Sequence, residues 1–175
     1  MFKTVFIVAV AAVAALLLYA GTRADTFRVE RSARIDAPPE RIFGLIDDLR
    51  RFNTWNPYEK KDPTAKGRYG TTTGGPGASY SWEGDKIGAG RMEIVDTAVP
   101  SQVTMKLDFY KPFEAHNMVE FTMKPEGGAT RVTWSMHGPA PFVTKLMQVF
   151  SIMDRMVGKD FEDGLNNLKT LAEAH

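Results

Sequence analysis

The longest regular pattern of apolar and polar positions lies in the last third of the chain, over residues 141–173. Apolar residues recur there every three or four positions, which is the period of an α-helix with one buried face. We predict a single long helix of roughly 40–45 Å, which must bury its apolar face against an element of similar length. The positions on this face are Val143, Leu146, Met147, Phe150, Met153, Val157, Phe161, Leu165, Leu168 and Leu171.

Upstream of this helix, short segments alternate apolar and polar residues, and a period of two is typical of β-strands with one buried face. Glycine and proline residues separate the segments. The predicted strands are 26–36, 79–83, 91–96, 102–109, 116–124 and 130–137. Glu126-Gly127-Gly128 predicts a tight hairpin turn between the last two strands.

Two short helices are predicted after the first strand. Pro38 and Pro39 suit the first turn of a helix, with Asp36 or Ala37 as its cap, and a second helical turn covers residues 49–55. The order of elements then predicts an α+β fold. In it a curved antiparallel sheet of about six or seven strands wraps around the long C-terminal helix.

The N-terminal segment is apolar, because residues 4–22 carry no charge. A helix of this length spans roughly 28 Å, close to the hydrocarbon thickness of a bilayer. We therefore expect residues 1–23 to be an uncleaved membrane anchor and residues 24–175 to form one domain. A cleaved signal peptide is the alternative, since Thr22-Arg23-Ala24 loosely fits a cleavage site. Lys3 favours an extracytoplasmic domain, whereas the arginines after the segment favour the opposite orientation.

Composition and charge argue against several function classes. The chain has no cysteine and a formal net charge of +1, so we expect no disulfide, thiolate chemistry or nucleic-acid binding. No phosphate-binding loop, dinucleotide fingerprint or serine-nucleophile motif is present in the sequence. The three histidines, His116, His137 and His175, are predicted to lie on the surface. We predict no metal site, cofactor or catalytic residue.

Several segments together carry a family resemblance. They are 27–32 with Ile35-Asp36-Ala37-Pro38-Pro39-Glu40, Trp55-Asn56-Pro57-Tyr58, Tyr80-Ser81-Trp82 with Gly90 and Met92, 130–134, and 160–168. They resemble the START-like (SRPBCC) superfamily, which includes polyketide cyclase/dehydrase-type and birch-pollen-allergen-like proteins. The resemblance covers about residues 26–172 and implies a helix-grip fold with a cavity between sheet and helix. It also implies binding of a lipid, sterol, hormone or polyketide, with catalysis in only some members.

Aromatic and methionine residues gather on the inward parity of the predicted strands and helix, and glycines 84, 88 and 90 are expected to leave space at one end. Methionine adapts to irregular apolar volumes, and apolar pockets are the usual small-molecule sites. Plain core packing would explain the same pattern. The predicted cavity lining is Trp55, Tyr58, Tyr80, Trp82, Met92, Phe109, Phe121, Trp134, Met136, Met153 and Val157; Met105, Met123 and Met156 share the inward parity.

Three functions agree with these patterns. The first, which we adopt, is a membrane-tethered domain that binds a small hydrophobic ligand, lipid or polyketide-like. The second is an aromatase/cyclase-type enzyme, for which Asp154, Arg31 and Asn117 are the polar candidates inside the cavity. The third is a non-catalytic scaffold of the cell envelope with a filled core. For Asp154 we favour the simpler interpretation, an ordinary charge at the boundary of the helix face.

Overall fold

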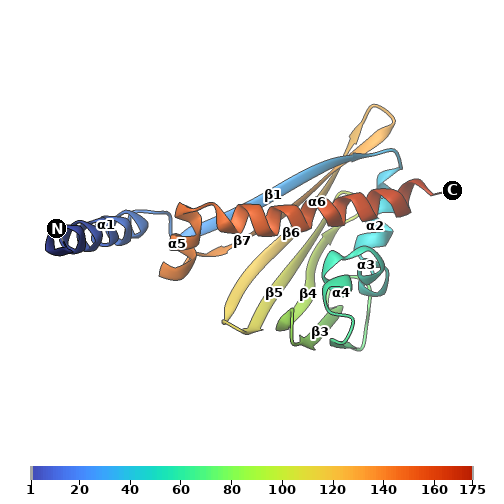
Figure 1. Cartoon of the computed structure of the whole chain (residues 1–175). Helices are drawn as coiled ribbons and strands as arrows, with labels where there is room; N and C mark the ends of the chain where they lie inside the picture. Colours follow the sequence, from blue (N-terminus) through green and yellow to red (C-terminus); the bar gives the residue numbers. More distant parts are fainter. Residues whose placement is uncertain (1, 175) are drawn as a thin grey trace.

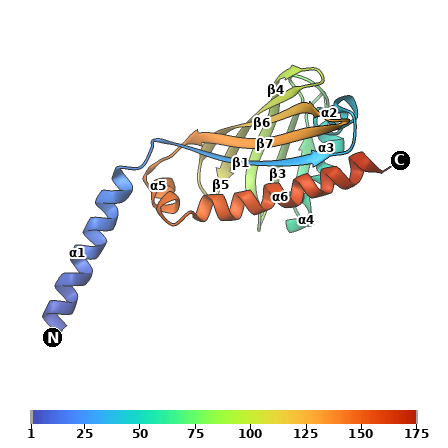
Figure 2. The same cartoon turned by 90° about the horizontal axis from the view of Figure 1, so that it is seen from above.

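The computed structural model describes residues 2–174, without the side chain of Met153. One seven-stranded sheet curves around the C-terminal helix, and an N-terminal helix projects from one end of the molecule (Figures 1 and 2). All neighbouring strands are antiparallel, in the order β1-β7-β6-β5-β4-β3-β2. The predicted helix-grip architecture is therefore confirmed. The strands are β1 (Thr26–Ile35), β2 (Lys66–Tyr69), β3 (Ser79–Gly84), β4 (Gly88–Ala98), β5 (Gln102–Lys111), β6 (Ala115–Glu126) and β7 (Ala129–Pro139).

The six predicted strands are all present, and β2 is the one that the sequence analysis missed. It pairs only with β3, at the edge of the sheet, and its residues are mostly exposed. An edge strand of this kind has no apolar face to bury, so it shows no period of two. The predicted turn after Glu126 is confirmed, since Gly127 and Gly128 have φ of 56° and 82° and close the β6–β7 hairpin.

Three short helices, rather than the predicted two, follow β1 and cover one end of the sheet. The first is capped by the backbone of Pro38, so the predicted cap at Asp36 or Ala37 is wrong. The third was missed because it begins directly after the second, where Asn56 accepts a hydrogen bond from the Tyr58 amide and Pro57 takes the first helical position. The bounds are α2 (Pro39–Ile46), α3 (Leu49–Trp55) and α4 (Pro57–Lys61).

The predicted long helix is two helices, α5 (Phe142–Val149) and α6 (Ile152–Glu173). The break lies at Phe150 and Ser151, and Ser151 has a left-handed φ of 55°. No proline or glycine marks this position, and the apolar period continues across it, so the sequence pattern did not reveal the break. Val143 and Phe150, predicted to be buried, are exposed because α5 turns away from the sheet. Leu171, predicted on the same face, and Met156, predicted to point inward, are exposed as well.

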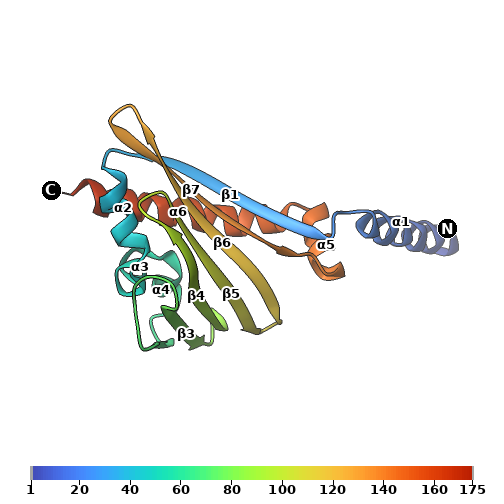
Figure 3. The same ribbon diagram turned by 180° about the vertical axis from the view of Figure 1, so that it is seen from behind.

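The prediction of a long helix with one buried face is confirmed for α6, which lies along β1 on the concave side of the sheet (Figure 3). Phe161, Leu165 and Leu168 are buried against the strands, while Lys159 stays exposed. The N-terminal helix α1 (Phe2–Gly21) is long and apolar enough to cross a membrane, and it stands almost entirely outside the domain. An N-terminal helix of this kind serves either as an anchor or as a signal sequence.

Candidate functional site

The concave face of the sheet, closed over by α6, forms the candidate site, and one half of it is densely filled with aromatic rings. Trp134 of β7 stacks on Phe161 of α6 at 4.1 Å and lies 4.9 Å from Phe121 of β6, between ring centroids. Trp55 and Phe52 of α3 meet the same rings edge-on, at 5.8 Å and 6.4 Å from Trp134. We call these five residues the aromatic cluster. They occupy the end of the concave face beside α2 and α3, and this end is closed.

The other half of the concave face is less tightly covered. Leu107 and Phe109 of β5, Trp82 of β3 and Val157 of α6 are all only half-buried. Trp82 and Phe109 contact each other edge to face, with centroids 5.8 Å apart. Val157 lies in the second turn of α6, so this half is on the side of the domain nearer α5. We call it the open end of the groove.

The predicted lining residues lie in several different parts of the structure. Trp55, Phe121 and Trp134 belong to the aromatic cluster, and Met92 and Met136 are buried beside it, while Trp82, Phe109 and Val157 lie at the open end. The side chain of Met153 is outside the described part of the structure. Met105 and Met123 are also buried, as their parity predicted.

Tyr58 and Tyr80 lie apart from this groove centre, toward α4 and the β2 edge. The Tyr80 hydroxyl donates to Glu59 at 2.8 Å. Burial, followed by the nearby carboxylate of Asp160, raises the pKa of Tyr58 well above its ordinary value. Asp160 in turn pairs with Lys61 at 2.5 Å, which ties α4 to α6. These contacts give both tyrosines a structural role at the edge of the site.

Arg31, one of the polar candidates, reaches from β1 to α6. Its guanidinium pairs with Asp154 at 3.0 Å and with Glu162 at 2.8 Å. A Cβ at Gly158 would lie against that guanidinium, so the glycine makes room for it on the helix surface. The hydrogen bond from Arg31 holds the pKa of Asp154 below its usual value. Asp154 is thus a charge partner of Arg31, and it is poorly suited to take up a proton near neutral pH.

Two buried polar groups lie on the concave face of the sheet. Asn117 is buried at the open end, where a Cβ on neighbouring Gly138 would collide with its amide oxygen. The indole N–H of Trp134 is buried and has no hydrogen-bond partner among residues 2–174. A buried donor without a partner costs about 1–3 kcal/mol, so a bound acceptor would relieve that cost. Asn117 was predictable from the sequence as a polar candidate, whereas the unpartnered Trp134 donor was not, because its partner depends on tertiary packing.

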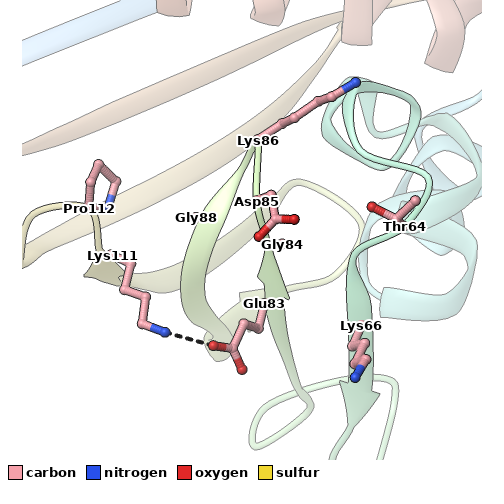
Figure 4. A pocket seen from close by; sticks show the side chains of 9 residues that line it. All are labelled: Thr64, Lys66, Glu83, Gly84, Asp85, Lys86, Gly88, Lys111 and Pro112. Carbon is pink, nitrogen blue, oxygen red and sulfur yellow. Dashed lines mark hydrogen bonds and ion pairs between the residues drawn. The ribbon is translucent and has the colours of Figure 1, made fainter.

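Two surface hollows lie outside the predicted lining. One, of about 760 Å³, lies among the β3–β4 and β5–β6 turns and β2 (Figure 4). It is polar, and the Lys111–Glu83 ion pair of 2.7 Å spans one side. The second, of about 400 Å³, lies between α4 and α6. Their linings are Thr64, Lys66, Glu83, Gly84, Asp85, Lys86, Gly88, Lys111 and Pro112, and Pro57, Lys60, Lys61, Asp163, Asn166 and Asn167.

The glycines expected to leave space at one end instead allow close contacts. A Cβ at Gly84 would collide with Asp62, and one at Gly88 with the backbone oxygen of Lys111. A Cβ at Gly90 would meet the Trp82 ring. Neighbouring atoms therefore fill the space where a Cβ of these glycines would point, although Gly84 and Gly88 also line the first surface hollow.

The prediction that the histidines lie on the surface is confirmed for His116 but only in part for His137. His116 is exposed as expected, but its Nδ1 contacts the buried carboxylate of Asp108 at 2.7 Å. His137 is half-buried, and its Nδ1 has no partner within the described part of the chain. His175 lies outside the described residues. Among residues 2–174 no group of acidic and histidine side chains is arranged to hold a metal ion.

The His116–Asp108 pair predicts a small pH dependence of stability. The hydrogen bond with Asp108 raises the folded-state pKa of His116 above the unfolded value of about 6.5. The stabilisation is then complete below the unfolded pKa and is lost as pH rises through the folded pKa. We expect the melting temperature to fall as pH rises from about 6.5 through the raised folded-state pKa of His116, and His116→Gln to reduce this fall. Equal pH profiles for both proteins would contradict the assignment.

Comparisons with known proteins agree with this architecture. Residues 26–173 match the model of a family described as polyketide cyclase/dehydrase and lipid transport. The chain therefore belongs to this family, whose fold is START-like. A comparison with curated proteins found no match.

Solved structures show the same fold. Ms6760 from Mycobacterium smegmatis is 22% identical, with a TM-score of 0.60 over 87% of this chain and 94% of its own. Ara h 8.0201 is 11% identical, with a TM-score of 0.58 over 84% and 97% of the two chains. DynU16, from the dynemicin biosynthetic locus, is 16% identical, with a TM-score of 0.60 over 87% of this chain and 48% of its own. At these identities the likeness concerns the fold alone.

Proposed function

We propose that the protein is a membrane-tethered START-like domain that binds a small hydrophobic ligand in the groove between the sheet and α6. The observation that carries the proposal is the apolar open end of the groove, where Trp82, Leu107 and Phe109 remain half-buried. Aromatic and aliphatic side chains left partly uncovered on a concave surface are typical of small-molecule sites. Family membership and fold support the same class of function.

The chemistry inside the groove favours a mainly apolar ligand with a single polar group. The buried indole N–H of Trp134 lacks an acceptor among the described residues, and Asn117 supplies an amide at the open end. Arg31 and Asp154 neutralise each other. A fatty-acid-like or polyketide-like molecule with one acceptor oxygen fits this set of groups. We propose tethering through residues 4–22, with the domain on the extracytoplasmic side.

An enzymatic role of the aromatase/cyclase type has weaker support. Proton transfer would need a polar group with a pKa near the working pH. The Arg31 hydrogen bonds keep Asp154 ionised. Asn117 has no acid–base function of its own. We therefore place binding ahead of catalysis.

The groove is tested by photolabelling of the full chain in membranes with a diazirine analogue of palmitate. Met136 is buried on the concave face of β7, and we expect Met136→Trp to fill the groove. Labelling of peptides from β5 and α6 should fall by about tenfold, the equivalent of 1.4 kcal/mol. Labelling of α1 peptides, which meet the analogue in the bilayer, should not change and serves as the internal reference.

Lys124→Trp is the matched control, because Lys124 is exposed on the opposite face of β6. It adds the same side chain outside the groove and should leave both labelling patterns unchanged. The binding proposal is wrong if peptides from β5 and α6 are labelled no more strongly in the wild-type protein than in Met136→Trp, and if analogues of a sterol and of an anthraquinone also fail to label them more strongly. The scaffold function then takes its place.

A further inference from the structure

Helix α5 is an unusual element for a folded domain, because none of its residues is buried. Phe142, Val143 and Phe150 are 48%, 64% and 52% exposed, and Ile152 and Met156 at the start of α6 are 37% and 63% exposed. We call these five residues the juxtamembrane patch. Ile152 and Met156 are one turn apart and so lie on one side of α6, and Phe150 directly follows the last residue of α5. An isolated helix of eight residues is marginal in water, so α5 requires an apolar surface to pack against.

The position of α5 shows which surface is available. It lies beside the C-terminal end of α1 in all three views (Figures 1 to 3). Lys145 of α5 pairs with Asp25 at 2.5 Å, and the Ala140 amide donates to the Asp25 carbonyl at 2.7 Å. Asp25 follows the end of α1 by four residues, which at full extension reach about 14 Å. If α1 spans a bilayer, α5 is held within reach of its headgroup region, because that region is several ångströms thick.

We propose that α5 and the first turn of α6 form an interfacial element, with the juxtamembrane patch inserted into the surface of the bilayer that holds α1. Amphipathic helices of this kind bury their apolar face about 5–10 Å into the boundary between headgroups and acyl chains, and aromatic residues such as Phe142 and Phe150 suit that depth. The exposed Arg155 and the polar residues Thr144 and Gln148 remain available to headgroups and water. The inference rests on the proposed tether but not on ligand binding.

This placement gives the groove an orientation toward the membrane. The open end lies on the same side of the domain as α5, because Asn117 lies against Gly138, four residues before α5, and Val157 lies in the second turn of α6. The aromatic cluster closes the opposite end, beside α2 and α3. A ligand drawn from the bilayer would then pass the patch and enter the groove without crossing bulk water.

The experiment uses the full chain in liposomes of phosphatidylcholine and phosphatidylglycerol. The natural sequence has no cysteine, so single cysteines can carry an environment-sensitive NBD fluorophore. Val143→Cys and Phe150→Cys probe the patch, and Val10→Cys probes the middle of α1. Val99→Cys is the matched control, since Val99 is 73% exposed in the turn between β4 and β5, at the far end of the sheet.

At both patch positions we expect the NBD emission to shift to the blue and to be quenched by lipids that carry a doxyl group near the headgroup. NBD at position 99 should show neither effect. The α1 probe should be quenched by deeply labelled lipids. If α1 is quenched while the patch positions behave like Val99, the interfacial element is disproved and the tether stands. If neither region is quenched, both are disproved. Quenching at the patch without quenching at α1 would overturn the tether and, with it, the proposed placement of the patch beside a membrane-spanning α1. The groove is judged separately by photolabelling.

Discussion

Phe161→Ala is expected to lower the free energy of unfolding by about 3–5 kcal/mol, the range for removing a large buried aromatic side chain. Phe161 is buried on α6 and stacks on Trp134 at 4.1 Å with the ring planes 12° apart. The substitution leaves a void in the aromatic cluster and removes the main contact between helix and sheet at this point. Urea unfolding of the full chain in non-ionic detergent, followed by tryptophan fluorescence, measures the loss.

Lys159→Ala, two residues earlier on the same helix, is the control. Lys159 is exposed and forms only an i,i+4 ion pair with Asp163 at 3.3 Å, so its loss should stay within about 0.5 kcal/mol. Equal losses at positions 159 and 161 would mean that the face of α6 assigned to the core is wrong.

The period of apolar residues predicted the strands and helices that bury one face and expose the other, which we call one-sided burial. β6 buries Asn117, Val119, Phe121 and Met123 and leaves the residues between them less buried, and β5 alternates in the same way as far as Lys106. α6 also buries a regular face. The same reasoning failed where burial is not one-sided. β2 is mostly exposed at the sheet edge, and α5 keeps an apolar period although none of its residues is fully buried. An apolar pattern indicates that one face of an element is removed from water, but it does not indicate whether protein or lipid packs against that face.

The candidate site was predictable in composition but not in geometry. The parity of Trp134, Phe121 and Met136 correctly placed them on the concave face. The pairing of Arg31 with Asp154 and Glu162 joins residues more than a hundred positions apart and depends on the close approach at Gly158. Ser151, at which the helix breaks, belongs to no sequence motif for helix termination. Such features follow from tertiary contacts, which a single sequence does not encode locally.

Trp134→Ala tests how much free space the groove has. Trp134 is buried at the centre of the aromatic cluster, and its removal should cost about 3–5 kcal/mol. The void would be lined by rings from Phe52, Trp55, Phe121 and Phe161, and apolar voids of this kind bind small aromatic molecules. Indole should therefore restore part of the lost stability, by about 2.7 kcal/mol when its concentration is a hundred times its dissociation constant. Thermal unfolding of the full chain with and without indole measures this recovery.

Trp82→Ala provides the comparison, because Trp82 is only half-buried at the open end and donates a long hydrogen bond of 3.4 Å to the Ile87 carbonyl. Its removal widens an opening that water can enter, so we expect a smaller loss of stability and no rescue by indole. Stabilisation of the wild-type protein by indole would show that the groove already has room beside the aromatic cluster, in favour of ligand binding. Rescue of Trp134→Ala alone would show that the cluster end is filled and would confine any ligand to the open end. If Trp134→Ala costs no more than Trp82→Ala, the aromatic cluster is not the packed centre of the fold.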